Sequence, residues 1–116
     1  MVDFKTSRKY IFFWNSNKID YFPLNKQLIE ENKLTVALKV SESEKNCSIR
    51  EIDCAPNKDV LAIVVDNLQT ATIIQWDLAK NNEVRAFEVD KSHQVIWGHD
   101  GRLVIVTEEL TILSRE

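Results

Sequence analysis

The stretch Thr70-Ala71-Thr72-Ile73-Ile74-Gln75-Trp76-Asp77-Leu78 decides the fold that the rest of the chain is expected to adopt. It is predicted to be a β-strand that ends in a Trp-Asp pair, with short apolar runs and turn residues on both sides of it. No stretch predicts a long helix. Ten candidate strands follow from this pattern, at residues 10–14, 19–22, 34–40, 49–54, 60–65, 70–78, 83–89, 94–97, 102–106 and 110–113. The sequence therefore predicts an all-β protein.

The predicted strands differ in how many of their faces are apolar. Residues 10–14 and 60–65 are apolar on both alternating faces, which indicates burial on two sides. Residues 34–40 alternate between apolar and polar, and residues 83–89 mix charged with apolar side chains, so each should have one exposed face. A sheet whose middle strands are apolar on both sides cannot bury itself, so it must pack against other sheets.

An internal period supports this interpretation. Four pairs of segments align with one another: Ile52 with Val95 at an offset of 43 residues, Leu61 with Leu103 at 42, residues 10–14 with 61–65 at 51, and residues 22–24 with 76–78 at 54. The repeating unit is therefore four strands long and spans about 42 to 50 residues. Units of this kind are expected to form four-stranded antiparallel sheets that stack on copies of themselves.

The residues resemble the WD-repeat β-propeller family. Residues 72–78 are similar to the family's third strand with its Trp-Asp ending, and residues 54–58 and 97–101 to the turn between its first and second strands. In that turn Pro56 should fix one φ angle and Asn57 should adopt a left-handed one. The residues that carry the resemblance are Trp76, Asp77, Pro56, Asn57, Trp97, Asp100 and Gly101.

Two departures from the family pattern concern its polar network. Ser92 stands where the family has the Gly of a Gly-His pair, and Thr70 stands near the place of an Asp before the third strand. The family's His, Asp and Trp hydrogen-bond network is therefore expected to be incomplete. Divergent repeats of this kind are similar to those of vesicle-coat and trafficking scaffolds, and residues 93–109 resemble a blade of the coatomer beta-prime subunit.

The resemblance implies one partial propeller across residues 1–116, with about two and a half blades. A partial blade is expected at 9–40, a full blade at 48–90 and a partial blade at 93–113, so that the chain starts at a second strand and stops at a third. Because propellers need at least four blades, the chain is expected to be a fragment of a larger propeller or to close with other chains.

Composition limits the classes of partner. The formal net charge is −3 and the isoelectric point about 5.4, with no basic run, which argues against nucleic acid. The longest apolar runs fall far short of the roughly 20 residues that span a bilayer, and the first residues lack the apolar core of a signal peptide. Membrane insertion is therefore not expected, and Cys47 and Cys54 should be reduced thiols in the cytoplasm.

No group of residues has the spacing of a reactive site. Cys47, Cys54, His93 and His99 lack the close pairs of a structural zinc site. Glu108 and Glu109 are neighbours on a predicted strand and point to opposite faces, so they cannot act as an acid and base pair. The two glycines form no phosphate-binding loop. No catalytic, cofactor-binding or metal-binding residue is predicted.

These observations favour a protein that is not an enzyme and that acts as a scaffold binding other proteins. Trp14, Trp76 and Trp97 are expected to be core residues, with Trp97 the most exposed because it precedes a turn. Self-association through open sheet edges is expected as well. Two alternatives remain open: part of an enzyme propeller whose catalytic residues lie elsewhere, and a small β-protein that oligomerises through its ends.

Overall fold

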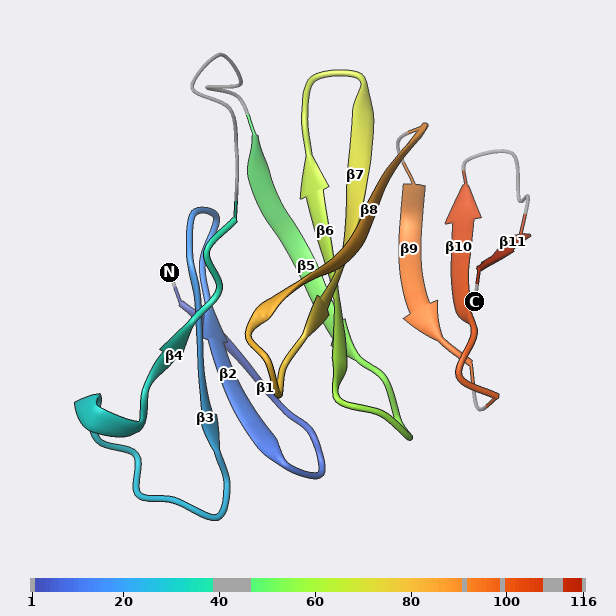
Figure 1. Ribbon diagram of the computed structural model, residues 1–116. Helices are drawn as coiled ribbons and strands as arrows, with labels where there is room; N and C mark the ends of the chain where they lie inside the picture. The colour runs from blue at the N-terminus through green and yellow to red at the C-terminus, as the bar shows by residue number, and fades with distance from the viewer. Residues whose placement is uncertain (1, 39–46, 91, 99, 108–111, 116) are drawn as a thin grey trace.

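The computed structural model describes residues 2–38, 47–90, 92–98, 100–107 and 112–115, which form three antiparallel β-sheets lying side by side (Figure 1). The described residues include no α-helix and a single 3-10 turn, η1 (Glu30–Asn32). The fold is therefore all-β, as the sequence predicted. None of the helical structure in these residues has the length or the apolar character to cross a membrane.

The strands of each sheet follow one another in sequence order. The first sheet contains β1 (Asp3–Thr6), β2 (Tyr10–Trp14), β3 (Ile19–Pro23) and β4 (Leu34–Thr35). The central sheet contains β5 (Ser48–Cys54), β6 (Val60–Asp66), β7 (Thr70–Asp77) and β8 (Asn82–Asp90). The third sheet contains β9 (Ser92–Trp97), β10 (Leu103–Thr107) and β11 (Ile112–Arg115). Tight turns join most neighbouring strands, which is why each sheet is antiparallel.

The strand boundaries differ from the predicted ones mainly in the first sheet. β1 was not predicted, because all four of its residues are exposed and it lacks an alternating apolar pattern. It nevertheless pairs with β2 along its whole length, so the first sheet begins with a first strand and not a second. At the other edge β4 is two residues long, although a strand was expected over residues 34–40.

The central sheet buries both of its faces. One face shares a core with the first sheet, and the other shares a core with the third sheet. Leu61 and Ile63 of β6 belong to the first of these cores, whereas Ala62 and Val64 belong to the second. This alternation explains why residues 60–65 are apolar at every position.

Burial also corrects the alignment between the first and central sheets. The first-sheet residues in the shared core are Tyr10, Phe12, Ile19 and Tyr21, and the central-sheet residues that meet the third sheet are Ala62, Val64, Ala71 and Ile73. Each of the four pairs is separated by 52 residues, and not by the 51 taken from the sequence. A shift of one residue exchanges the two faces of a strand, so the alignment at 51 compared opposite faces.

The backbone of the turns differs from the prediction at one position. Asn57 was expected in a left-handed conformation, but Asn81 is the one non-glycine residue of the described chain with a positive φ, at 53°. The Asn57 turn is closed by a hydrogen bond from the Ala55 N–H to the Val60 carbonyl (2.9 Å). Gly101, at φ 83°, serves the β9–β10 turn, where the lack of a side chain removes the steric penalty.

Candidate functional site

The residues that resemble the WD-repeat pattern gather at one end of the molecule. Trp76 and Asp77 close β7, Pro56 and Asn57 lie in the β5–β6 turn, and Trp97 closes β9. Asp100 and Gly101 follow in the β9–β10 turn. This end of the sheets, at the bottom of Figure 1, also holds the β1–β2 turn, so it collects turns from all three sheets.

Trp76 takes part in a polar node between the first and central sheets. Its indole N–H donates to Oδ1 of Asn81 (3.0 Å), which also accepts a hydrogen bond from the Tyr21 hydroxyl (3.1 Å). The amide of Asn81 donates in turn to the Thr35 carbonyl (3.2 Å), and the Tyr21 hydroxyl is also 2.9 Å from the Leu78 carbonyl. One asparagine side chain therefore bonds to β3, the residue ending β4, and β7.

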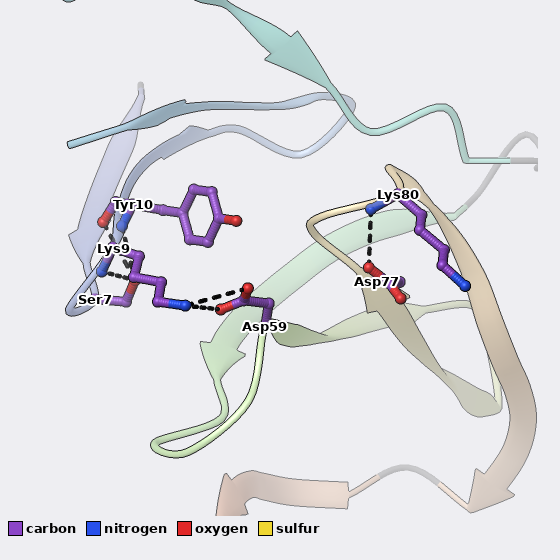
Figure 2. A network of polar contacts seen from close by, with 6 residues as sticks. All are labelled: Ser7, Lys9, Tyr10, Asp59, Asp77 and Lys80. Carbon is purple, nitrogen blue, oxygen red and sulfur yellow. Dashed lines mark hydrogen bonds and ion pairs between the residues drawn. The ribbon is translucent and has the colours of Figure 1, made fainter. Parts of the chain in front are cut away.

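Asp77 has a local role. Its Oδ1 accepts a hydrogen bond from the Lys80 backbone N–H (2.9 Å), which holds the β7–β8 turn closed (Figure 2). This is the side-chain to backbone bonding that favours aspartate in turns. The left-handed backbone of Asn81 then aims its side chain at Trp76 and Tyr21. The Trp-Asp pair thus combines a contact between sheets with a turn closure.

Carboxylates link the first strands, β5 and β9, of the central and third sheets. Glu51 accepts a hydrogen bond from the Val95 N–H (3.0 Å), and Asp53 accepts one from the Trp97 N–H (3.0 Å). The Trp97 indole N–H also donates to the Asp53 carbonyl (2.9 Å). Both carboxylate contacts span 44 residues, so the sheets meet in a regular register. Trp97 is half-buried, between these contacts and Lys58.

A related contact joins the first sheet to the central one. Lys5 of β1 donates to the Ile52 carbonyl (2.8 Å) and lies 3.6 Å from Oδ1 of Asp53. Lys5 lies on β1 and Trp97 on β9, so Asp53 contacts the first strand of each neighbouring sheet. The edge strands β1, β5 and β9 therefore lie in succession along this line of contacts.

A groove of about 860 Å³ lies at this end between the first and central sheets. Its walls are the β1–β2 turn and the β5–β6 turn, and a neighbouring hollow of about 650 Å³ extends it past the end of β3. We refer to the two together as the basic groove, because its lining includes five cations and two carboxylates: Lys5, Arg8, Lys9, Lys26, Lys58, Asp53 and Asp59.

The contacts inside the basic groove are weak and exposed. The Lys9 ammonium lies 3.5 Å from each carboxylate oxygen of Asp59, and most of the Lys9 side chain is exposed (Figure 2). Lys58 lies 4.8 Å from the centre of the Trp97 ring, close enough for a cation–π contact. The Ser7 hydroxyl accepts hydrogen bonds from the backbone N–H groups of Lys9 and Tyr10, which shapes the β1–β2 turn.

Two titratable side chains of the groove are held in their neutral forms. Burial raises the pKa of the Tyr10 phenol, and the negative charge of Asp59 raises it further. Burial likewise raises the pKa of the Cys54 thiol, although a hydrogen bond with Ser7 opposes this. A thiol reacts as its thiolate, so this environment makes Cys54 a poor nucleophile. Tyr10 and Cys54 serve here as partly apolar surface.

The remaining candidate groups do not form a reactive centre in the described chain. Cys47 and Cys54 are not joined in a disulfide. Among the described residues, no group of three or more His, Cys, Asp or Glu side chains lies close enough together to hold a metal ion. His99, Glu108 and Glu109 lie outside the described residues, as does the side chain of His93.

Sequence reasoning missed the polar node and the groove. Asn81 was predicted as a turn residue, and nothing local shows that it would meet Tyr21, 60 residues away. The cations of the groove come from separate parts of the chain, so no basic run reveals them. The one available signal was the clustering of Lys5, Arg8 and Lys9 close to the first apolar strand.

No family model, no curated protein and no solved structure matches this chain.

Proposed function

We propose that this protein is a scaffold that is not an enzyme and that its sheets are blades of a WD-repeat-like propeller, which bind other proteins. The central sheet, which buries both faces against neighbouring sheets, carries the proposal. Radial packing of four-stranded antiparallel sheets is the arrangement by which propellers bury their blades. The repeated contacts from Asp53 to β1 and β9 support the same arrangement.

The outward faces of the first and third sheets support the presence of further blades. Ile11, Phe13 and Phe22 lie 52 residues before Ile63, Val65 and Ile74, the central-sheet residues that pack on the first sheet. Val104 and Val106 lie 42 residues after Ala62 and Val64, which pack on the third sheet. The outward face of the first sheet thus matches the central-sheet face that packs on the first sheet, and the outward face of the third sheet matches the central-sheet face that packs on the third. Such faces would be covered by further sheets of the same kind, from more chain or from other chains.

The scaffold class is supported by the chemistry of the groove. The pKa of the Cys54 thiol is raised and not lowered, and the carboxylates of Glu51 and Asp53 are occupied by backbone N–H groups. These groups maintain sheet packing. A cytoplasmic scaffold of the vesicle-coat or trafficking type remains our proposal, and the absence of a disulfide between Cys47 and Cys54 fits a reducing compartment.

The test is whether the outward face of the first sheet drives association of the 116-residue chain. Analytical ultracentrifugation over a range of concentrations should show self-association, and Phe13→Glu should weaken it at least about tenfold, since it places a charge on an apolar face. Val84→Glu is the matched control, because Val84 is 54% exposed on the outermost strand β8. Circular dichroism would verify that both variants keep their strands.

Two results would contradict the proposal. One is a monomer at every concentration, because the outward apolar faces would then be stable in water. The other is an equal effect of Phe13→Glu and Val84→Glu, because association would then depend on general charge. A fixed small oligomer that Phe13→Glu leaves intact would favour a self-contained β-protein in place of a propeller.

A further inference from the structure

The basic groove concentrates positive charge in a chain that is acidic as a whole. The formal charge of the chain is −3, yet the five cations and two carboxylates of the groove leave a local charge of +3. Arg8 and Lys26 are exposed, and no ion pair involves either side chain within the described residues. The groove is therefore electrostatically complementary to an anionic partner.

The existing ion pairs of the groove can exchange partners at little cost. Lys9 and Asp59 are 3.5 Å apart, and the side chains are 69% and 32% exposed. Exposed pairs of this kind contribute little to stability, because water screens the two charges. An incoming carboxylate can therefore bind Lys9 without loss of a strong interaction, whereas Lys5, which also donates to the Ile52 carbonyl, is held in place.

Four backbone N–H groups in and beside the groove are already hydrogen-bonded, so they are not available to a phosphate. The N–H groups of Ala55 and Val60 are bonded to carbonyls within the β5–β6 turn. Those of Lys9 and Tyr10 are bonded to the Ser7 hydroxyl. Charge is supplied instead by separate side chains along both hollows, which matches carboxylates spaced along an extended chain better than one compact phosphate.

The floor of the groove provides apolar surface between the cations. Tyr10 lines both hollows, and its hydroxyl points into the space beside Asp59 in Figure 2. Pro56 and Ala55 line one hollow, and Pro23 and Leu24 line the other. A peptide can pack side chains on such surface while its carboxylates reach the rim, which a bare anion cannot do.

We propose that the basic groove binds an extended, acidic peptide segment of a partner protein. This inference rests on the proposed scaffold function and names the class of partner for one site of it. Arg8 and Lys26 bind carboxylates at the open rim, Lys9 leaves Asp59 for the ligand, and Lys58 binds from the β5–β6 turn. Lys58 also lies over Trp97, so binding is expected to alter the surroundings of that indole.

The experiment uses the whole chain and a fluorescein-labelled peptide of alternating Glu and Ser. A peptide of about ten residues extends over roughly 33 Å and so can pass along both hollows. Fluorescence anisotropy should show binding that weakens several-fold as salt rises from about 0.05 M to about 0.2 M, because exposed charges are screened. A peptide of alternating Gln and Ser should bind at least about tenfold more weakly.

Variants at the rim locate the binding site. Arg8→Glu combined with Lys58→Glu should raise the Kd for the acidic peptide at least about tenfold. Lys80→Glu combined with Arg85→Glu is the matched control, since it makes the same change in net charge at exposed positions outside the groove. That control should change the Kd less than about threefold, and circular dichroism would verify folding of both variants.

Three results would overturn the inference. The first is equal binding of the Glu and Gln peptides, and the second is an equal loss in the groove variant and its control. The third is binding of phosphatidylserine vesicles, but not of the peptide, with the same dependence on Arg8 and Lys58, which would assign the groove to a lipid surface. Ultracentrifugation of the same samples tests the scaffold proposal separately. If the chain self-associates but does not bind the peptide, only the inference about the basic groove is rejected.

Discussion

The two interfaces of the central sheet use different side chains at equivalent positions. Where the first sheet meets the central sheet, Tyr10, Phe12 and Tyr21 fill the space, with the Tyr10 and Tyr21 rings 5.6 Å apart in a T-shaped arrangement. Where the central sheet meets the third sheet, the positions equivalent to Tyr10 and Phe12 hold Ala62 and Val64. Aromatic rings are thus among the buried residues of the first interface, whereas the buried residues of the second are all aliphatic.

The polar contacts of the two interfaces differ in the same way. Across the first interface, Tyr21 bonds to the side chain of Asn81, and the side chains of Asn81 and Lys5 donate to backbone carbonyls. Across the second interface, the carboxylates of Glu51 and Asp53 accept hydrogen bonds from backbone N–H groups. The two interfaces of the central sheet therefore require different chemical groups from the neighbouring sheets.

The largest expected loss of stability comes from removing an aromatic ring between the first and central sheets. Phe12 is fully buried between the first and central sheets, so Phe12→Ala should lower the free energy of unfolding by about 3–5 kcal/mol through lost burial and a cavity. Urea unfolding measures this change. Phe4 is 70% exposed on β1, so Phe4→Ala should stay within about 0.5 kcal/mol. Similar losses in the two variants would contradict the described packing.

The second interface should be sensitive to added volume. Ala71 is fully buried between the central and third sheets, so Ala71→Leu should lower the free energy of unfolding by about 1–3 kcal/mol through overpacking. Ala86 is exposed on β8, and Ala86→Leu serves as the control in the same urea titration. A stabilising Ala71→Leu would show that this interface holds an unfilled space.

The smallest effect concerns the hydroxyl group of Tyr21. Tyr21→Phe removes the hydrogen bonds to the Leu78 carbonyl and Asn81, and should lower the free energy of unfolding by about 0.5–1.5 kcal/mol at neutral pH. Burial also raises the pKa of Tyr21 above its ordinary value of 10.0, with smaller contributions from Tyr10 and Asp77.

That shift gives a dependence on pH with a definite sign. Above about pH 10 the unfolded chain loses the phenol proton while the folded chain keeps it, so the stability present at lower pH is lost as pH rises. Tyr21→Phe should flatten this loss in urea titrations between neutral and alkaline pH. Tyr10→Phe is the control for the hydrogen bonds, since the pKa of Tyr10 is also raised, whereas it is the Tyr21 hydroxyl that bonds to Asn81. An unchanged alkaline slope in Tyr21→Phe would contradict the burial of its hydroxyl.

Periodicity and turn residues predicted most of the fold. The strand at 60–65, which is buried on both faces, and the exposed strand at 83–89 were identified correctly, because the number of buried faces determines which positions of a strand are apolar. β1 was missed because all four of its residues are exposed and show no apolar pattern, although the strand pairs with β2. The offset between the first and central sheets was wrong by one residue, because residues 10–14 are apolar on both faces and do not define which face is inward.

The candidate site was harder to predict for a physical reason. The basic groove and the polar node around Asn81 form where different sheets meet. The residues in contact there lie about 50 to 60 positions apart in sequence. Turn residues satisfy local backbone requirements first, so Asn81 and Lys58 look like ordinary turn residues. Their partners, Tyr21 and Trp97, become visible only when the sheets are packed together.

The edge strands β4 and β8 affect how copies of the protein can associate. β4 is two residues long, and β8 carries Glu83, Arg85 and Glu88 among its exposed residues. Short or charged rims are the means by which natural sheets resist the edgewise growth that leads to amyloid-like fibres. The edges formed by β4 and β8 are therefore poorly suited to pairing with another copy, so the expected self-association through open sheet edges is restricted to the remaining edge strands.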